Sequence, residues 1–197
     1  MKPKTMFLVA GVILTFAIIW NLVPNGDNII EISDKIVIPV KVHIVVDDSG
    51  IYTSSRNEEN ILFLLEKANK IWDQGNIHFQ IEEIIITNVS SAAIPNVING
   101  NTYEILNHEN FEENKINLFL VQNLNNINGL SLKDINSIFV SDHTTVNDFR
   151  TTAHELGHIL GLSHVGPSNK LLARGQNGEI LTDGEISIAR NNAKHLF

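Results

Sequence analysis

Residues His154 to His164 read HELGHILGLSH. His154 and His158 are four residues apart, so on an α-helix they lie on one face and can both bind a single metal ion. Glu155 lies at the edge of that face, where its carboxylate can hold a metal-bound water. The run therefore predicts a helix that presents two histidines and a carboxylate to a metal site.

His164 can reach the same ion only if the helix ends before it. In a continuous helix, the six residues after His158 would carry His164 about 9 Å along the axis and turn it off the metal face. Gly161 lies between the two histidines, and glycine ends helices because it adopts the left-handed conformation at low cost. We therefore predict a chain reversal at Gly161. Three histidines would then leave the fourth tetrahedral position for water, as in catalytic zinc sites.

The alternative is a histidine-rich helix that binds no metal. The apolar residues around the motif argue against it, because they recur at helical spacing on the side opposite the histidines. These residues are Phe149, Ala153, Leu156 and Leu160. A helix with separate core and metal sides is the better interpretation.

At these residues the chain resembles a known family. The pattern His-Glu-x-x-His-x-x-Gly-x-x-His is the metzincin signature, and residues 152–164 are most similar to the matrixin-like and reprolysin-like branches. The resemblance implies a zinc endopeptidase in which Glu155 is the general base and a methionine-containing turn lies beneath the metal. The implied zinc ligands are His154, His158 and His164. Three more segments resemble the first helix, the second strand and the C-terminal helix of such domains: 69–72, 77–79 and 186–190.

The chain departs from this family at the methionine turn. Its only methionines are Met1 and Met6, so none follows the histidine motif. By spacing, the segment 171–175 stands where the family would place its turn, with Leu172 at the methionine position. Leucine has similar bulk and apolar character, and such exchanges usually cost less than about 1.5 kcal/mol. No tyrosine follows His164 either, so the tyrosine ligand of astacin-like relatives is absent.

The remaining sequence predicts an α+β fold. We expect a metzincin-like twisted mixed sheet, mostly parallel and of four or five strands, with two long helices, a small C-terminal subdomain after Gly161 and a C-terminal helix. Apolar and β-branched runs predict strands at 36–46, 77–86, 116–121, 129–132 and 137–140. Helices are expected at 57–72, at the histidine motif, near 103–108, and from the Thr182/Glu185 capping box to about Lys194. By resemblance, strand 129–132 would form the lower edge of the sheet, where an extended peptide could pair antiparallel.

Composition limits the class of protein. The chain has 197 residues, of which 43% are apolar, enough for one well-packed domain. Its formal charge of −8 argues against nucleic acid as a partner. There is no cysteine, which excludes disulfides, a thiolate metal site and a cysteine-based zymogen latch.

The N-terminus predicts a membrane anchor or signal segment over residues 1–24. Lys2 and Lys4 precede an apolar run from Met6 to Val23, which is near the short end of the 17–25 residues or so that span a bilayer. A basic N-terminal flank would place the following domain outside the cytoplasm. A cleaved signal is the rival prediction, which would make the protein secreted, and a buried soluble helix is the third. Residues 25–34 read as a linker and residues 35–197 as a zinc metallopeptidase domain.

Several polar side chains outside the motif are expected to have structural roles. His43 and His78 lie in predicted strands, and His143 lies in a loop, although it could also bind a second ion. Asp47 and Asp48 are expected to form a solvated turn rather than a calcium site. Two cations, Arg174 and Arg190, are expected to pair with carboxylates.

Together these observations predict a zinc-dependent endopeptidase that acts on a peptide or protein substrate. Glu155 would take a proton from a zinc-bound water and pass it to the leaving amine. One alternative is a catalytically weak, zinc-stabilised binding or adhesion domain on the cell exterior, which would keep the metal without turnover. A second alternative is hydrolysis of a non-peptide amide by the same chemistry. The membrane, through the N-terminal segment, is the other expected partner.

Overall fold

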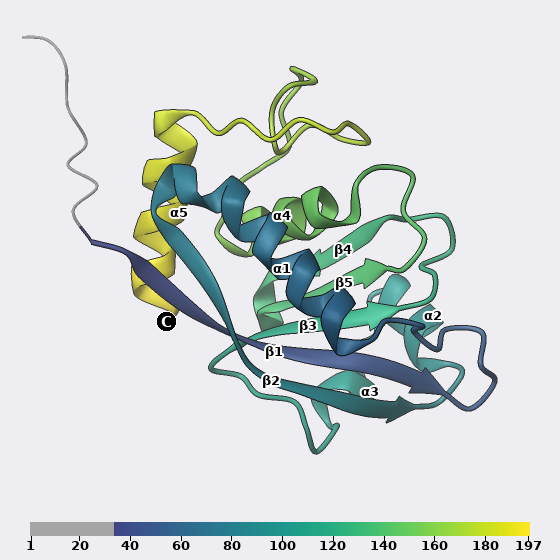
Figure 1. Ribbon diagram of the computed structural model, residues 1–197. Helices are drawn as coiled ribbons and strands as arrows, with labels where there is room; N and C mark the ends of the chain where they lie inside the picture. The colour runs from purple at the N-terminus through teal and green to yellow at the C-terminus, as the bar shows by residue number, and fades with distance from the viewer. Residues whose placement is uncertain (1–33) are drawn as a thin grey trace, which may run out of the picture. The chain divides into compact units, whose positions relative to one another are not determined.

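The computed structural model describes residues 34–197, which form a five-stranded sheet with helices on both faces (Figure 1). The strand order is β2-β1-β3-β5-β4. Strands β2, β1, β3 and β5 run parallel to one another, whereas β4 pairs antiparallel with β5. The strands are β1 (Ile36–Asp47), β2 (Ile77–Val89), β3 (Ile116–Val121), β4 (Gly129–Leu132) and β5 (Ser137–Ser141). The predicted α+β class and mostly parallel sheet are confirmed.

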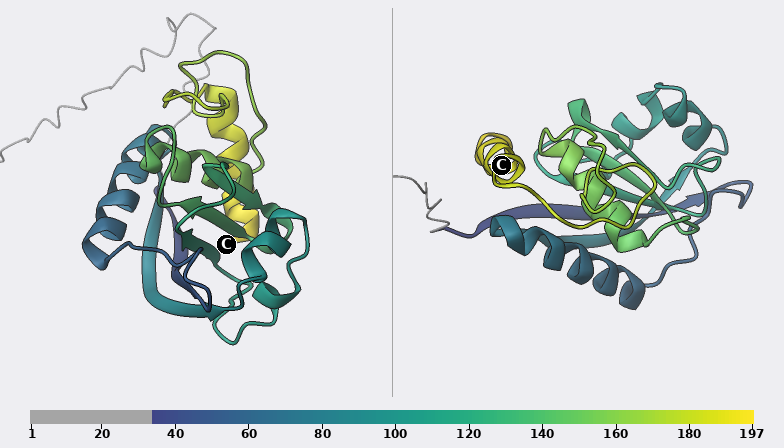
Figure 2. Two further views of the ribbon diagram at one scale, coloured as in Figure 1. Left: turned by 90° about the vertical axis from the view of Figure 1, so that its right-hand side faces the viewer. Right: turned by 90° about the horizontal axis from the view of Figure 1, so that it is seen from above.

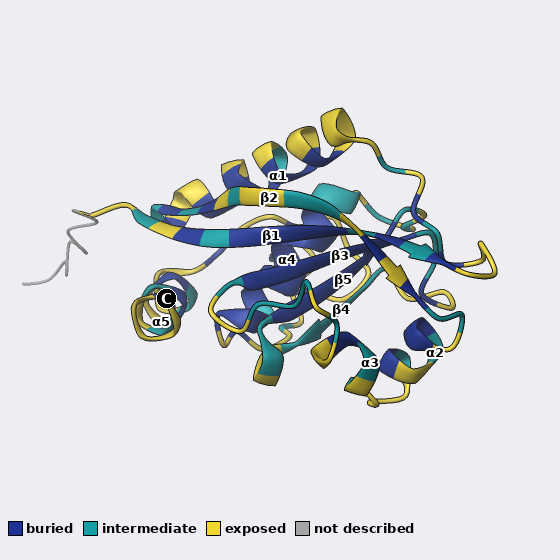
Figure 3. Cartoon of the chain, turned by 90° about the horizontal axis from the view of Figure 1, so that it is seen from below, coloured by how far each residue is buried: buried dark blue, intermediate teal, exposed yellow. Residues whose placement is uncertain are grey.

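The central strands β1, β3 and β5 are mostly buried and rich in apolar residues because both faces of the sheet are covered. On β3, Ile116, Leu118 and Leu120 belong to a core with the helices α1 (Glu58–Trp72) and α4 (Asp148–Ile159). The alternate residues Phe119 and Val121 pack on the opposite side. That second core includes the short helices α2 (Ala93–Ile98) and α3 (Tyr103–Leu106). Figure 3 shows α1 and the pair α2 and α3 on opposite sides of the strands.

Helices α1 and α5 (Asp183–Leu196) begin at side-chain caps, of which the sequence predicts the one at Thr182. Asn57 caps α1 in a reciprocal pair with Asn60, and Thr182 caps α5 in the same way with Glu185. In each cap, side chains satisfy backbone N–H groups that the first helical turn leaves without a partner. Helix α5 packs beside the start of β1 (Figure 2).

The segment between β2 and β3 differs from the prediction. Residues 94–113 have weak periodicity, yet they contain α2 as well as the expected short helix α3, which ends at Leu106 instead of near residue 108. Ile94, Val97 and Ile105 are fully or almost fully buried against the sheet. These helices are too short to show an apolar period, so tertiary packing defines them.

His43 has the structural role expected of it, whereas Asp47 lies in the expected turn but is buried instead of solvated. His43 is buried, its Nδ1 lies 2.8 Å from Thr87 Oγ1, and its Nε2 lies 3.1 Å from Asn117 Oδ1. Burial lowers the pKa of His43 to about 4, so it is a neutral core residue. Asp47 accepts hydrogen bonds within its turn from Tyr52 N at 2.9 Å and from Thr53 Oγ1 at 2.9 Å. The turn therefore uses this carboxylate internally.

The prediction of a transmembrane helix or signal anchor requires correction. No helix within residues 34–197 is long and apolar enough to cross a membrane. The apolar run from Met6 to Val23, on which that prediction rested, lies outside the described residues, as does the linker apart from Asp34. The division into segments 1–24, 25–34 and 35–197 stays a prediction.

Candidate metal centre

Three histidine side chains converge on one point beside α4. His154 and His158 come from successive turns of the helix, and His164 comes from the loop that follows it. The three Nε2 atoms are 3.2 Å apart between His154 and His158, 3.2 Å between His154 and His164, and 3.1 Å between His158 and His164. Within residues 34–197, these three are the one group of side chains arranged to hold a metal ion.

The spacing of the three nitrogens fits a tetrahedral zinc ion. A Zn–N distance of about 2.0–2.1 Å places the nitrogens of a tetrahedral site about 3.3–3.4 Å apart. The observed 3.1–3.2 Å is close to that value. All three ligands would be neutral imidazoles, a donor type that suits zinc and leaves one coordination position for water or substrate.

Backbone carbonyls set the tautomer of two of these imidazoles. His154 Nδ1 lies 2.7 Å from the oxygen of Leu171, and His158 Nδ1 lies 2.8 Å from the oxygen of Leu162. A carbonyl can only accept, so each Nδ1 must carry the proton. Both Nε2 atoms then have a free lone pair directed at the metal position. Burial also lowers the pKa of His154 to about 4 and lowers that of His158, which favours the neutral, metal-binding form.

The reversal that brings His164 back occurs at the predicted glycine. Gly161 has φ +82°, in the left-handed region, and a side chain at this position would collide with Asn192 of α5. Asn192 Nδ2 in turn donates to the oxygen of Leu160 at 3.0 Å and so satisfies one of the last carbonyls of α4. The left-handed turn was predictable from the sequence. The contribution of α5 was not, because Asn192 lies 32 positions further along the chain.

Glu155 lies beneath β4, where the sheet passes close to α4. Its side chain is buried, and a Cβ atom at Gly129 would lie only 2.8 Å from Glu155 Cγ. Only glycine therefore allows β4 to approach the helix at this point. Burial raises the pKa of Glu155 to about 7, against the opposing effects of Ser131 and of the positive charge on Arg150. The carboxyl group thus has the proton affinity that a general base needs near neutral pH.

An open cleft gives access to these groups. It has a volume of about 310 Å³ and lies between residues 127–131, which include most of β4, and the histidines with Glu155. A second hollow of about 410 Å³ adjoins it and shares Ser131, His158 and His164. The hollows together form a groove that runs along β4 and past the three histidines.

Arg150, which was not among the predicted site residues, is buried and binds the backbone of the segment beneath the site. Arg150 lies one helical turn before His154, and its Nε donates to the oxygen of Gly178 at 3.2 Å. Its Nη2 also donates to the carbonyls of Leu171 and Ala173. The Leu171 oxygen therefore receives hydrogen bonds from both Arg150 and His154, which couples the arginine to a candidate ligand. The sequence contained one indication of this role, because Arg150 precedes His154 by the same four residues that separate His154 from His158 and so lies on the same helix face.

The segment that Arg150 holds contains Leu172. This side chain is fully buried beneath α4. A Cβ atom at Gly157 would lie 3.3 Å from Leu172 Cδ1 and 3.5 Å from the ring of Trp72. The glycine inside the histidine motif thus lets the helix pack closely on Leu172 and on α1.

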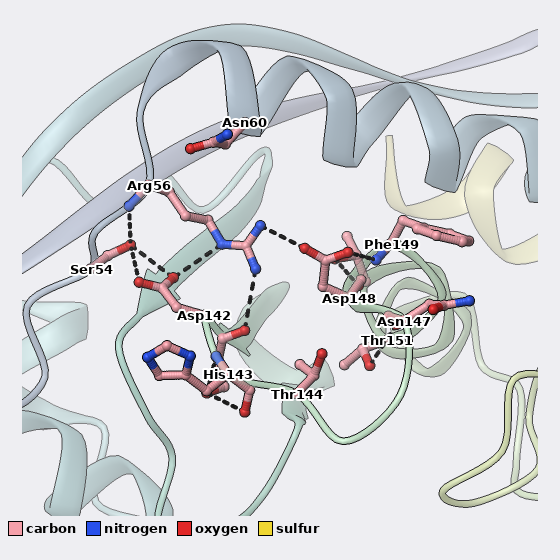
Figure 4. Close-up of polar contacts among 12 residues, drawn as sticks. Ser54, Arg56, Asn60, Asp142, His143, Thr144, Asn147, Asp148, Phe149 and Thr151 are labelled. Carbon is pink, nitrogen blue, oxygen red and sulfur yellow. Dashed lines mark hydrogen bonds and ion pairs between the residues drawn. The ribbon is translucent and has the colours of Figure 1, made fainter.

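An ion-pair network outside the cleft anchors the start of α4 (Figure 4). Arg56 Nε donates to Asp142 Oδ1 at 3.0 Å, and Arg56 Nη1 donates to Asp148 Oδ2 at 2.8 Å. Asp142 also accepts from the Ser54 hydroxyl and from the backbone N–H of Ser55. The network joins the residues before α1 to the end of β5 and the first turn of α4. Its carboxylates are satisfied by these donors, and His143 beside it belongs to no metal-binding group within residues 34–197.

Within residues 34–197, neither Arg174 nor Arg190 pairs with a carboxylate, contrary to the prediction. Arg174 Nε donates instead to His164 Nδ1 at 3.1 Å. Arg190 donates to backbone carbonyls, including that of Gly75 at 2.6 Å and that of Asp34 at 2.9 Å. Arg190 therefore links α5 to the residue before β1 and to the turn after α1. Arg174 lies exposed at the rim of the cleft.

Comparison with solved structures identifies the fold. Archaemetzincin from Methanopyrus kandleri superposes with a TM-score of 0.57 at 13% identity, over 88% of this chain and 99% of that one. Metalloproteinase-II from Bacteroides fragilis gives a TM-score of 0.56 at 12% identity, over 80% of this chain and 53% of the other. The chain shares its fold with these two proteins. A chain in the structure of a chaperone–substrate complex also matches, with a TM-score of 0.56 at 15% identity, over 83% of this chain and 35% of that one.

The similarity lies in the fold and not in the sequence as a whole. A comparison with protein-family models gives no match, and a comparison with curated proteins gives none either. At 12–15% identity, the likeness to the three solved structures describes how the chain is folded. What the chain does must be argued from the histidines, Glu155 and the groove.

Proposed function

We propose that the chain is a zinc-dependent endopeptidase of the metzincin type. One observation carries the proposal: three imidazole Nε2 atoms converge at 3.1–3.2 Å beside the buried carboxyl group of Glu155, in a groove open to solvent. A site that only stabilised the fold would be closed by a fourth protein ligand. A binding domain would have no use for Glu155, because that carboxylate is not needed to hold the metal.

The chemistry divides between the metal and the chain. Zinc held by the three histidines would polarise the scissile carbonyl and lower the pKa of a bound water to near 7, so that the water could act as a nucleophile. Glu155 accepts the proton of the attacking water and transfers it to the leaving amine. The Leu171 and Leu162 carbonyls keep the imidazoles of His154 and His158 in the tautomer that metal binding requires.

The substrate in this proposal is an extended peptide that binds along β4. This strand is the last in the sheet order and pairs only with β5 among the described strands, so its outer edge has free backbone groups. The groove runs beside that edge and past the histidines. Backbone pairing would hold a peptide largely independently of its sequence, while side chains meet the walls of the groove.

We also assign Leu172 to the position of the methionine in the family's turn. The support is its complete burial under α4 and its contact distance to the Gly157 position. Since leucine fills a similar volume, the apolar floor under the metal is kept. The absence of methionine therefore does not argue against a zinc site here.

The direct test is proteolysis by the full chain. Protein loaded with one equivalent of zinc should cleave unfolded casein and members of a peptide library. Removal of the metal with a chelator should abolish cleavage, and added zinc should restore it while the melting curve returns to that of the loaded protein. Peptide termini identified by mass spectrometry would locate the cleaved bonds.

Two results would contradict the proposal. A zinc-loaded protein that cleaves no peptide but binds peptides would favour the zinc-stabilised binding domain. Cleavage that persists at full rate without metal would show that a different site or a contaminating protease is responsible.

A further inference from the structure

Arg174 makes a contact with His164 that differs from those of the other two histidines. His154 and His158 each present Nδ1 to a carbonyl oxygen, which accepts a proton. His164 Nδ1 instead faces a donor, the Nε–H of Arg174, at 3.1 Å. In this arrangement His164 Nδ1 must be the acceptor, so the proton of the neutral ring is on Nε2.

This contact is incompatible with metal binding through His164 Nε2. A neutral imidazole carries one proton, and ligation through Nε2 moves that proton to Nδ1. The N–H of Arg174 and the N–H of His164 would then face each other without an acceptor. Arg174 must therefore leave His164 when the metal binds, which frees its guanidinium.

The other charged groups that line the cleft are already engaged. Arg150 is buried, and its donors are directed at the Leu171, Ala173 and Gly178 carbonyls. Glu155 is buried beneath Gly129 and is the one carboxylate among the residues described as lining the cleft. Arg174 is exposed and is the free cation of this cleft beside His164, whereas Lys133, also exposed, lines only the second hollow.

We propose that Arg174 determines substrate specificity by binding a carboxylate side chain of the peptide close to the scissile bond. The substrates would thus be peptides with a glutamate or aspartate at one position near the cleaved bond. A planar guanidinium suits this task because its N–H groups match both oxygens of a carboxylate. This inference rests on the proposed function, which supplies a peptide bound along β4 and past the histidines. Binding of that peptide can be measured without turnover.

The test uses the zinc-loaded full chain carrying Glu155→Gln, which retains the three histidines. Fluorescein-labelled decapeptides of alanine and asparagine, each with a single glutamate at a different position, are compared with twins that carry glutamine there. Fluorescence anisotropy should show about 10-fold tighter binding of the glutamate peptide at one or two adjacent positions. Adding Arg174→Gln should remove this preference, and Arg174→Lys should restore only part of it.

The matched control is Lys194→Gln, which removes one positive charge from an exposed position on α5 that lines neither hollow. It should leave the glutamate preference unchanged. Zinc content is measured in every variant, because Arg174 contacts His164. Equal affinity of glutamate and glutamine peptides at all positions would overturn the inference. The same conclusion would follow if the preference survived Arg174→Gln or disappeared equally in Lys194→Gln.

The two proposals fail separately in these experiments. If the protein prefers acidic peptides but never cleaves them, the role of Arg174 is supported and the proposed peptidase activity is rejected. If the protein cleaves peptides without preferring acidic ones, the peptidase activity is supported and the role of Arg174 is rejected.

Discussion

Replacing Glu155 by glutamine should lower kcat/KM for a cleaved peptide by a factor of about 10² to 10⁴ while zinc content stays at the wild-type level. The amide has the size of the carboxyl group but cannot accept the proton of the attacking water. The three histidines are untouched, so the metal should remain. Because Glu155 is buried and has no ion-pair partner among residues 34–197, loss of its charge should not lower the melting temperature.

The measurement compares wild type and variant at equal zinc occupancy on one fluorogenic peptide taken from the library. Glu179→Gln is the matched control, since it makes the same chemical change at an exposed residue outside the groove. The control should cleave like the wild type. If Glu155→Gln cleaved equally well, Glu155 would not be the base and the mechanism would be wrong.

Replacing His164 by alanine should weaken zinc binding by about 10²- to 10³-fold. Structural zinc sites with four ligands have apparent binding free energies of about 10–16 kcal/mol, so one ligand accounts for roughly 3–4 kcal/mol. His164 is exposed and lies outside the apolar core, so the metal-free variant should melt with the metal-free wild type. Dialysis against a chelator of known affinity, followed by metal analysis, would measure the change.

His195→Ala provides the matched control, because it removes an exposed histidine from the end of α5. It should retain zinc like the wild type. One full equivalent of tightly held zinc in His164→Ala would remove His164 from the ligand set and leave the chain reversal at Gly161 without a role in metal binding.

The parts of the site that could be predicted from the sequence depend on local geometry. The four-residue spacing of His154 and His158 determines their common face on a helix, and Gly161 supplies the left-handed residue that reverses the chain. The strands and the capped helices also follow from short-range patterns, and all five predicted strands are present with small differences in their ends.

The parts that could not be predicted depend on contacts between distant segments. Arg150 bonds to carbonyls 21 to 28 positions further along the chain. The partner of Arg174 depends on where the loop after Gly161 returns, and the expected carboxylate proved to be an imidazole. Helix α2 forms because its side chains cover the back of the sheet, which no local period reveals.

A catalytic zinc ion in this chain requires three histidine ligands and one open coordination position. X-ray absorption at the zinc edge, recorded on the full chain with one equivalent of metal, would identify and count the ligands. We expect a four-coordinate ion with three imidazole nitrogens and one oxygen at about 2.0–2.1 Å. Fewer than three imidazoles around the zinc, or a fourth protein nitrogen in place of the oxygen, would show that the site is not the catalytic centre proposed here.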